Sequence, residues 1–352
     1  MTPEPLPKAV DAKYLTCALR RCGALDAGRV RDVAVESSRP TLLSSIMRLR
    51  LNYDGAVEGP ASLILKIGLP DRAAELADLG RREVEFYSAV AGATSARLVP
   101  RCFEAVWEGE AKTWHLLLED LTDSHLVATK WPLPPTFEQC RRIVHTLAHF
   151  HAAWWDDSRL GVSIGRWLDA DGMKTYLQRF AERYEAFTTQ LGERLSGERR
   201  DLYERFLDAA PRLLARYHSH RNLSVVHGDA HVWNFLLPRD GGNDIRLFDW
   251  DAWRLGVASN DLAYMMALHW HPERRRRMEQ PLLDHYHAAL SAHGVRGYDR
   301  SALDDDYRFS TLWQLMTPVW QAAADLPPVI WWNHLERIMM AVDDLGCVDL
   351  LG

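Results

Sequence analysis

"SVVHGDAHVWNFLL" (residues 224–237) places a polar cluster between two apolar runs. Its polar members are His227, Asp229, His231 and Asn234. The first three alternate along the chain, which is the spacing of a metal-ligand set on one strand. Asp229 and Asn234, five residues apart, instead offer a carboxylate and an amide to a phosphoryl-transfer site. The remaining sequence decides between these two hypotheses.

The metal hypothesis depends on the alternation of His227, Asp229 and His231. Residues i, i+2 and i+4 of a strand share a face, so these side chains are suited to hold Zn²⁺ together. Three ligands and a water make a hydrolytic site. However, Gly228 favours a turn over a straight strand, and no further histidine-rich segment lies at a characteristic distance. A metal-dependent hydrolase remains an alternative that rests on this motif alone.

The phosphoryl-transfer hypothesis needs more parts, and the chain supplies them in order. It requires a carboxylate that orients a hydroxyl, an amide and a second carboxylate that hold Mg²⁺, and a lysine that neutralises phosphates. Asp229 and Asn234 supply the first carboxylate and the amide. Asp249 follows fifteen residues later, at the end of the apolar strand in "IRLFDWDAW". Upstream, Lys66 ends "SLILK", and Glu83 lies seventeen residues further on, in the predicted helix "RREVEFY".

Several segments resemble one known family. "VVHGDAHVWNFLL", "LFDWDAWRLG" and "SNDLAYMMAL" are similar to the motif series of the aminoglycoside phosphotransferase and choline kinase superfamily, which is kinase-like in fold. "RREVEFY", "LLLEDL" and "LAHFHAAWW" further resemble its ecdysteroid-kinase-like branch and the bacterial relatives of that branch. The resemblance spans about residues 30 to 290.

The resemblance implies a role for each member of the ordered set. Asp229 is expected to be the catalytic residue that accepts the hydroxyl proton. Asn234 and Asp249 are expected to coordinate Mg²⁺. Lys66 is expected to contact the α- and β-phosphates of the donor, ATP or GTP, and Glu83 is expected to hold Lys66 in place.

The resemblance also implies supporting roles. Backbone groups around Glu119 and Leu121 are expected to hydrogen-bond the purine base. His227 is expected to organise the catalytic loop without binding metal, and Asp261 is expected to brace the same loop. These expectations make the protein a Mg²⁺-dependent kinase that phosphorylates a hydroxyl group of a small molecule, such as an antibiotic or another alcohol.

The order of predicted elements indicates a bilobal α+β fold, which the resemblance identifies as protein-kinase-like. Residues 1–118 read as strands with two helices and form the expected nucleotide-binding domain. Residues 119–352 read as mostly helical and form the expected domain for the catalytic loop and acceptor. Apolar periodicity predicts helices at residues 9–22, 71–92, 137–157, 170–192, 197–219, 260–270, 274–293, 301–323 and 329–345.

One segment departs from the pattern of kinase-like folds. The turn that covers the phosphates is often rich in glycine, but residues 37–45, "SSRPTLLSS", contain none. Backbone N–H groups of a turn bind anions whatever side chains they carry, so the segment is still suited to meet phosphates. The missing glycines also favour a second function, a non-catalytic kinase-like protein that binds a ligand.

The acceptor is expected to bind among the C-terminal helices. Trp313, Thr317 and Trp320 lie at helical spacing on one face, and tryptophan faces attract cations. They are candidates for an aromatic wall of the acceptor pocket. Packing between helices explains the same spacing, so both interpretations stay open.

Composition narrows the class of protein. The chain has 352 residues, 47% of them hydrophobic, and a net charge of −6, which argues against a nucleic-acid partner. The basic run 274–277 is interpreted as a solvated helix face. Five scattered cysteines predict a reducing compartment, and no signal peptide or membrane span is evident. We expect a cytoplasmic monomer or homodimer whose partners are a nucleoside triphosphate and a small alcohol.

Overall fold

The computed structural model describes residues 7–41, 44–55, 57–69, 74–94 and 97–352. Two predicted features fall partly outside this description. Leu42 and Leu43 of the glycine-free segment are not described, nor are residues 71–73, where the predicted second helix begins. In the part of the chain that is described, no helix combines the length and the apolar character needed to cross a membrane.

The chain divides into two compact units. Unit 1 consists of Met1–Val127 with Leu236–Trp253, and unit 2 consists of Ala128–Phe235 with Arg254–Gly352. The N-terminal part contains an antiparallel sheet and the C-terminal part is helical, so the prediction of an α+β fold is confirmed. The functional division between residues 118 and 119 stays a prediction.

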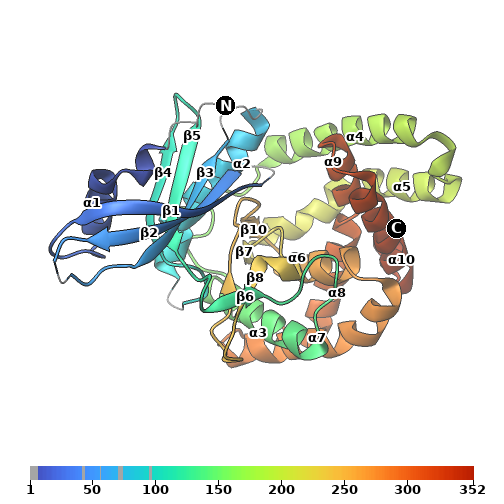
Figure 1. Cartoon of the computed structure of the whole chain (residues 1–352). Coiled ribbons are helices and arrows are strands. Elements are labelled where there is room, and N and C mark those ends of the chain that lie inside the picture. The colour runs from blue at the N-terminus through green and yellow to red at the C-terminus, as the bar shows by residue number, and fades with distance from the viewer. Residues whose placement is uncertain (1–6, 42–43, 56, 70–73, 95–96) are drawn as a thin grey trace. The chain divides into compact units, whose positions relative to one another are not determined.

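Unit 1 is built on a five-stranded antiparallel sheet (Figure 1). Its strands, in spatial order, are β1 (Val30–Pro40), β2 (Ser44–Tyr53), β3 (Ser62–Gly68), β5 (Thr113–Glu119) and β4 (Cys102–Glu108). Successive strand residues point to opposite faces, and one face of the sheet buries a leucine core. Helix α1 (Ala12–Arg21) packs on this core, which includes Leu49, Leu51, Leu63, Leu65 and Leu117.

The glycine-free segment joins β1 to β2. The backbone N–H of Thr41 donates to the Ser44 carbonyl over 2.7 Å, and the Ser44 N–H donates to the Thr41 hydroxyl over 3.0 Å. Serine and threonine hydroxyls often close turns in this way. These two amides are therefore engaged inside the turn.

A helix and a small second sheet complete unit 1. Helix α2 (Ala74–Glu85) continues into a π-helical turn at Phe86–Val90 and a 3₁₀ turn at Ala91–Ala93. The ring of Phe86 stacks on Trp250, with centroids 3.9 Å apart. The second sheet contains β6 (His125–Val127), β8 (Phe235–Pro238) and β9 (Arg246–Leu247), in that order. The last two strands come from the distant segment of unit 1.

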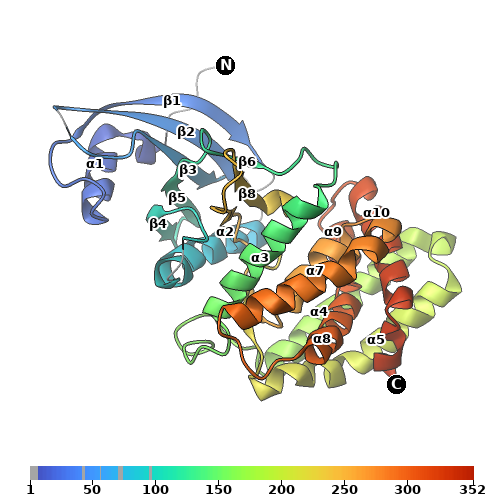
Figure 2. The ribbon, with the colours of Figure 1, turned by 90° about the horizontal axis from the view of Figure 1, so that it is seen from below.

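Unit 2 consists mainly of helices, and α3 and α7 lie side by side (Figure 2). The helices are α3 (Phe137–Ala153), α4 (Ala170–Leu191), α5 (Gly197–Leu214), α6 (Ser259–Leu262), α7 (Pro272–Ala292), α8 (Arg300–Trp313), α9 (Met316–Ala323) and α10 (Pro328–Asp344). Two strands, β7 (Ser224–Val226) and β10 (Arg254–Gly256), pair antiparallel. A capping box at Thr136 and Gln139 begins α3.

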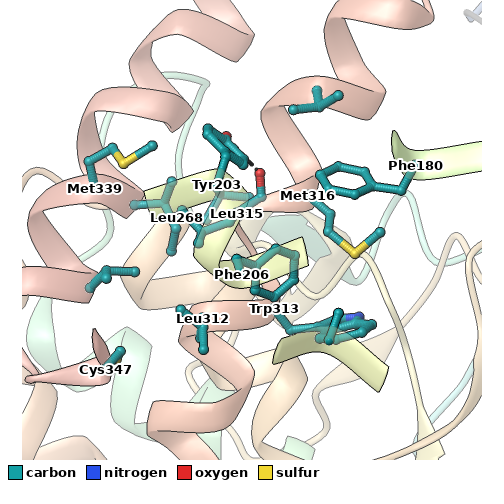
Figure 3. Close-up of a cluster of buried hydrophobic side chains, with 14 of the residues drawn as sticks. Phe180, Tyr203, Phe206, Leu268, Leu312, Trp313, Leu315, Met316, Met339 and Cys347 are labelled. Atoms are coloured by element: carbon teal, nitrogen blue, oxygen red, sulfur yellow. Dashed lines mark hydrogen bonds between the residues drawn. The ribbon is translucent and has the colours of Figure 1, made fainter. Parts of the chain in front are cut away.

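Buried aromatic and aliphatic side chains from α4, α5, α8, α9 and α10 form the core of unit 2 (Figure 3). Trp313 lies inside this core, 8% exposed, with its ring 5.5 Å from that of Phe206. Trp320 packs at its edge, with the Arg183 guanidinium 4.0 Å from its ring centroid. Both tryptophans thus contribute to helix packing, and their role in an acceptor pocket stays a prediction.

The prediction of a single helix at residues 301–323 is wrong in one respect. It is two helices, α8 and α9, with a break at Gln314 and Leu315. The Leu315 N–H donates to Leu312 and the Thr317 N–H donates to Gln314, which are i→i−3 bonds. Pro318 follows in the first turn of α9, where the N–H that proline lacks would have no intrahelical partner. The proline therefore marks the start of α9.

Candidate active site

Three of the predicted site residues meet within unit 1. The Nζ atom of Lys66 lies 2.9 Å from Oε1 and 2.7 Å from Oε2 of Glu83, and 2.5 Å from Oδ1 of Asp249. The Glu83 carboxylate also accepts a hydrogen bond from the Trp250 backbone. Glu85, two residues further along the same helix, is exposed and pairs with Arg81. The structure thus joins one cation to two carboxylates from distant segments.

The local sequence explains how these side chains converge. On β3, Leu63 and Leu65 face the leucine core, so Lys66 points to the opposite face. Helix α2 buries Glu83, which is 1% exposed. Asp249 follows β9 in a turn and has a φ of +67°, a left-handed conformation that is costly for a residue with a Cβ atom.

Electrostatics keep Lys66 charged. Burial disfavours the ammonium form, but the carboxylates of Asp249, Glu83 and Asp251 outweigh burial and raise the pKa of Lys66. The indole ring of Trp114, with its centroid 5.9 Å from Nζ, adds a cation–π contact. The side chain of Asp249 is 39% exposed, whereas that of Glu83 is 1% exposed. Asp249 therefore remains accessible to a ligand.

Two further predicted residues meet in the quoted loop of unit 2. The amide nitrogen of Asn234 donates to Oδ2 of Asp229 over 3.0 Å and to its backbone carbonyl over 2.9 Å. Gly228, with a φ of +82°, turns the chain after β7, a conformation that glycine adopts without strain. Because Asn234 directs its nitrogen at Asp229, its amide oxygen is the atom that it can offer to a cation.

Asp261 holds the start of this loop. Its Oδ2 accepts a hydrogen bond from the His227 N–H over 2.7 Å, and its Oδ1 accepts one from the Gly228 N–H over 2.9 Å. The ring of His151 lies 3.1 Å from the same carboxylate, and Tyr286 bonds the other ring nitrogen. Burial opposes ionisation of Asp261, but the His151 hydrogen bond and the neighbouring charges lower its pKa.

The sequence analysis did not assign His151 as a partner of Asp261. Its only signal was its place in "LAHFHAAWW", a segment named for its family resemblance. The structure buries His151 completely, on the face of α3 that carries the apolar residues. It acts through the Asp261 carboxylate on the loop backbone.

The alternating residues His227, Asp229 and His231 do not share a strand face. β7 ends at Val226, and the turn at Gly228 interrupts the strand geometry. The buried ring of His227 accepts a hydrogen bond from the Asp229 N–H over 3.3 Å. Within the described residues, no group of three or more histidine, cysteine, aspartate or glutamate side chains is arranged to hold a metal ion.

The predicted base-binding groups lie at the end of β5 in unit 1. The Glu119 N–H donates to the Arg101 carbonyl over 2.8 Å, and the Leu121 carbonyl accepts from the His125 N–H over 2.8 Å. The Glu119 carboxylate pairs with Arg97 over 3.0 Å. The base-binding prediction concerns other backbone groups of this segment, among them the Glu119 carbonyl and the Leu121 N–H.

A cluster of three histidines, His231, His269 and His334, borders Asp229 in unit 2. The Nε2 atom of His231 lies 3.6 Å from Oδ2 of Asp229, and the His231 ring is 5.5 Å from that of His269. His269 in turn lies 4.5 Å from His334. Burial, then Arg337 and His231, lower the pKa of His334 to about 3, so this ring is neutral at neutral pH. The sequence analysis did not identify this cluster.

The two sets of residues belong to different units. Lys66, Glu83 and Asp249 lie in unit 1, whereas Asp229 and Asn234 lie in unit 2. Joint coordination of Mg²⁺ by Asn234 and Asp249 therefore stays a prediction. Each residue taken alone fits the requirement, because magnesium prefers hard oxygen ligands and each offers one.

Proteins of known structure share this fold. A putative aminoglycoside phosphotransferase from Ralstonia eutropha JMP134 is 15% identical over 96% of this chain and 98% of its own, with a TM-score of 0.56. A microcompartment-associated aminopropanol kinase is 13% identical over 96% and 99%, also with a TM-score of 0.56. The GDP and kanamycin complex of APH(2″)-IIIa is 12% identical over 96% and 99%, with a TM-score of 0.51. The fold is thus that of the kinase-like phosphotransferases.

The sequence itself gives the family. The profile of the phosphotransferase enzyme family, APH, matches residues 51–329. None of the curated proteins compared with the chain matches it significantly. Because the family match covers more than half of the sequence, the chain belongs to the phosphotransferase enzyme family.

Proposed function

We propose that this protein is a kinase that transfers the γ-phosphoryl group of ATP or GTP to a hydroxyl group of a small molecule. The observation that carries the proposal is the buried Lys66, held in ionic contact with both Glu83 and Asp249. A structural role alone does not require a lysine between two carboxylates, because burying charges costs free energy. Positioning a cation for phosphate groups does require it.

In this proposal each residue has one task. Lys66 neutralises charge on the donor phosphates, and Glu83 fixes its position. Asp229 orients the acceptor hydroxyl and accepts its proton. Asn234 holds Oδ2 of Asp229, which leaves Oδ1 for the hydroxyl. The proton thus moves from the acceptor oxygen to the Asp229 carboxylate as the phosphorus–oxygen bond to the acceptor forms and the bond to the donor breaks.

The cation in this proposal is Mg²⁺, held by the amide oxygen of Asn234 and the carboxylate of Asp249. When bound, it neutralises charge on the donor phosphates. The purine base is proposed to bind the Glu119 carbonyl and the Leu121 N–H. His227 and Asp261 are proposed to hold the loop in place, which their hydrogen bonds to its backbone support.

The acceptor is proposed to be a small alcohol, antibiotic or metabolic, that binds near Trp313 and Trp320. Nucleotide and kanamycin in a structural relative support this class of partner. We also propose that the chain is related to the ecdysteroid-kinase-like branch. The segment "LAHFHAAWW", which contains His151, supports this relation. We further propose that the protein is cytoplasmic and that it is a monomer or homodimer. Its proposed functional domains are residues 1–118 and 119–352.

Thermal unfolding with nucleotides tests the proposal. A ligand at a hundred times its Kd stabilises the folded state by about 2.7 kcal/mol. We expect Mg-ATP or Mg-GTP to raise the midpoint of wild type and Asp229→Ala, and EDTA to remove the shift. Asp229→Ala should lose turnover of any acceptor found by screening alcohols. Activity of more than a few per cent in this variant would contradict the assigned role of Asp229.

Two results would favour other functions. Nucleotide binding without phosphoryl transfer to any alcohol, amino alcohol or aminoglycoside would favour a non-catalytic binding protein. Stoichiometric zinc in the purified protein, with destabilisation by EDTA and no nucleotide response, would favour the hydrolase.

A further inference from the structure

Unit 1 contains a cavity of about 710 Å³ that does not include Lys66, Glu83 or Asp249. Its walls come from the start of β3 with the two residues before it, the segment from the π-helical turn to the start of β4, the end of β5, and Arg246 of β9. Pockets for small molecules usually measure about 300–1,000 Å³. The cavity therefore has the size of a ligand site, although no part of the proposed phosphoryl-transfer machinery lines it except Glu119.

One wall residue carries a polar group without a partner. The side chain of Tyr87 lines the cavity, and the residue is 5% exposed. Its hydroxyl has no hydrogen-bond partner among the described residues, whereas buried hydroxyls are nearly always bonded. Burial raises the pKa of Tyr87 well above its usual range, so the phenol is protonated at neutral pH. Because the hydroxyl itself is shielded from solvent, Tyr87 presents its ring to the cavity.

Among the charged residues of the wall, one cation has no ion-pair partner. Glu119 is paired with Arg97 and Arg246. Asp120 is paired with Arg48, which is not a wall residue, over 2.6 Å.

Arg101 is the remaining cation of the wall. It lies 4.9 Å from the ring centroid of Phe103. Among the described residues, no carboxylate lies within ion-pair distance of its guanidinium group. The unmatched charge of Arg101 therefore favours an anion. Apolar wall residues such as Val99, Pro100 and Phe103 favour an organic body attached to it.

The cavity is connected to the Lys66 site through one helix. Tyr87 follows Glu83 by four residues, which is about one helical turn. The charges of Glu83 and Asp249 act on the Tyr87 phenol. The π-helical turn at Phe86–Val90 lies at this junction, and such turns are frequent at functional sites. Contacts between a ligand and Tyr87 therefore affect the position of Glu83.

We propose that this cavity is a regulatory site for a small organic anion with an apolar body and one carboxylate or phosphate group. Arg101 pairs with the anionic group, and the apolar wall, including the Tyr87 ring, holds the body. Occupancy alters the position of Glu83 and so the binding of nucleotide at Lys66. This last step rests on the proposed function, whereas the binding of the anion does not.

Calorimetric titration of the full chain, without nucleotide, tests the site. The probes are phenyl phosphate, benzoate and inorganic phosphate. We expect phenyl phosphate to bind wild type with one site and more tightly than inorganic phosphate. Arg101→Gln should weaken it at least about tenfold, as the loss of a charge-assisted hydrogen bond implies. The matched control is Arg31→Gln, an exposed arginine of β1 paired with Asp32, which should bind like wild type. Equal binding by both variants, or no binding by wild type at millimolar probe, overturns the proposal.

Tyr87→Phe gives a second and independent readout. Removing an unsatisfied buried hydroxyl is neutral or stabilising for the folded state, so the thermal midpoint without ligand should stay equal or rise. Phenyl phosphate should bind this variant as it binds wild type, because the ring is kept. A lower midpoint, or weaker binding of phenyl phosphate, would mean that the hydroxyl has a partner, and would overturn this assignment of Tyr87.

The regulatory step has its own measurement. The Kd of Mg-nucleotide should change when phenyl phosphate saturates wild type and should not change in Arg101→Gln; an unchanged Kd in wild type overturns this step. If no nucleotide binds at all, the proposed function fails, and the anion titrations still show whether the cavity binds an organic anion.

Discussion

The Nζ atom of Lys66 lies 2.7 Å from Oε2 of Glu83, and the two side chains are only 10% and 1% exposed. A charge pair removed from water in this way is stable only while both partners are present, because the protein cannot easily solvate one of them alone.

Removing only the cation should therefore destabilise unit 1. We expect Lys66→Met to lower the free energy of unfolding by about 3 kcal/mol, because Glu83 is left buried without a counterion. The double variant Lys66→Met/Glu83→Leu should recover a large part of this loss. Urea unfolding followed by tryptophan fluorescence measures both. The exposed pair Arg81 and Glu85 is the control, because Arg81→Met should change the free energy by less than about 1 kcal/mol.

The left-handed backbone of Asp249 predicts an unusual order of stability. Asp249→Gly and Asp249→Ala both remove the carboxylate, but only alanine keeps a Cβ atom at a φ of +67°. The glycine variant should be more stable by about 1 kcal/mol, and neither variant should retain activity. At Asp251, where φ is not positive, the order should reverse, since glycine costs about 0.5–1 kcal/mol in chain entropy there. Urea midpoints that rank alanine above glycine at Asp249 would contradict this account.

Asp261 should contribute stability at neutral pH. Asp261→Asn replaces one acceptor oxygen by a donor that faces backbone N–H groups, so we expect a loss of about 3 kcal/mol. The lowered pKa of Asp261 means that this contribution is complete above its unfolded value of about 3.9 and disappears as pH falls through the lower folded value. The difference between wild type and variant should thus be constant from roughly pH 5 to 8 and shrink in acid. Asp305→Asn, an exposed position on α8, should show no such difference.

His334 should make the fold sensitive to mild acid. Its folded pKa of about 3 lies below the unfolded value of about 6.5, so between these values the unfolded chain binds a proton that the folded chain does not. Stability should therefore fall as pH drops from about 6.5, by up to about 1.4 kcal/mol per pH unit. Unfolding free energies of His334→Gln should decline less steeply between roughly pH 7 and 5. The exposed His218 is the control, and a parallel decline in wild type and His334→Gln would count against the assignment.

Local sequence patterns predicted one half of the candidate site well. Lys66 could be placed at the end of a strand and Glu83 on a helix, since alternation and helical periodicity depend on neighbours in sequence. The structure joins them as the motif order implied. Helical geometry also allows only one of Glu83 and Glu85 to point inward, because residues two apart on a helix face different directions.

Contacts between distant helices were beyond these patterns. His151 reaches Asp261 across 110 residues, and nothing in the sequence near either residue records that contact. Arg275 shows the same limit, because the run 274–277 predicted a solvated face. Arg275 is instead 1% exposed and paired with Glu279 and Asp344. Only the packing of α7 decides which of four adjacent arginines lies inside.

The return of the chain to unit 1 at Leu236–Trp253 has a consequence for biosynthesis. Domains usually fold in order as they leave the ribosome, but this unit stays incomplete until translation has passed Trp253. Until then the nascent N-terminal segment holds a lysine that lacks one of its two counterions, and a strand, β6, that lacks its partner strands β8 and β9. Fragments that stop at Val127 should therefore be targets of chaperones and proteases, and the ribosome-bound chain should resist folding until most of the message has been read.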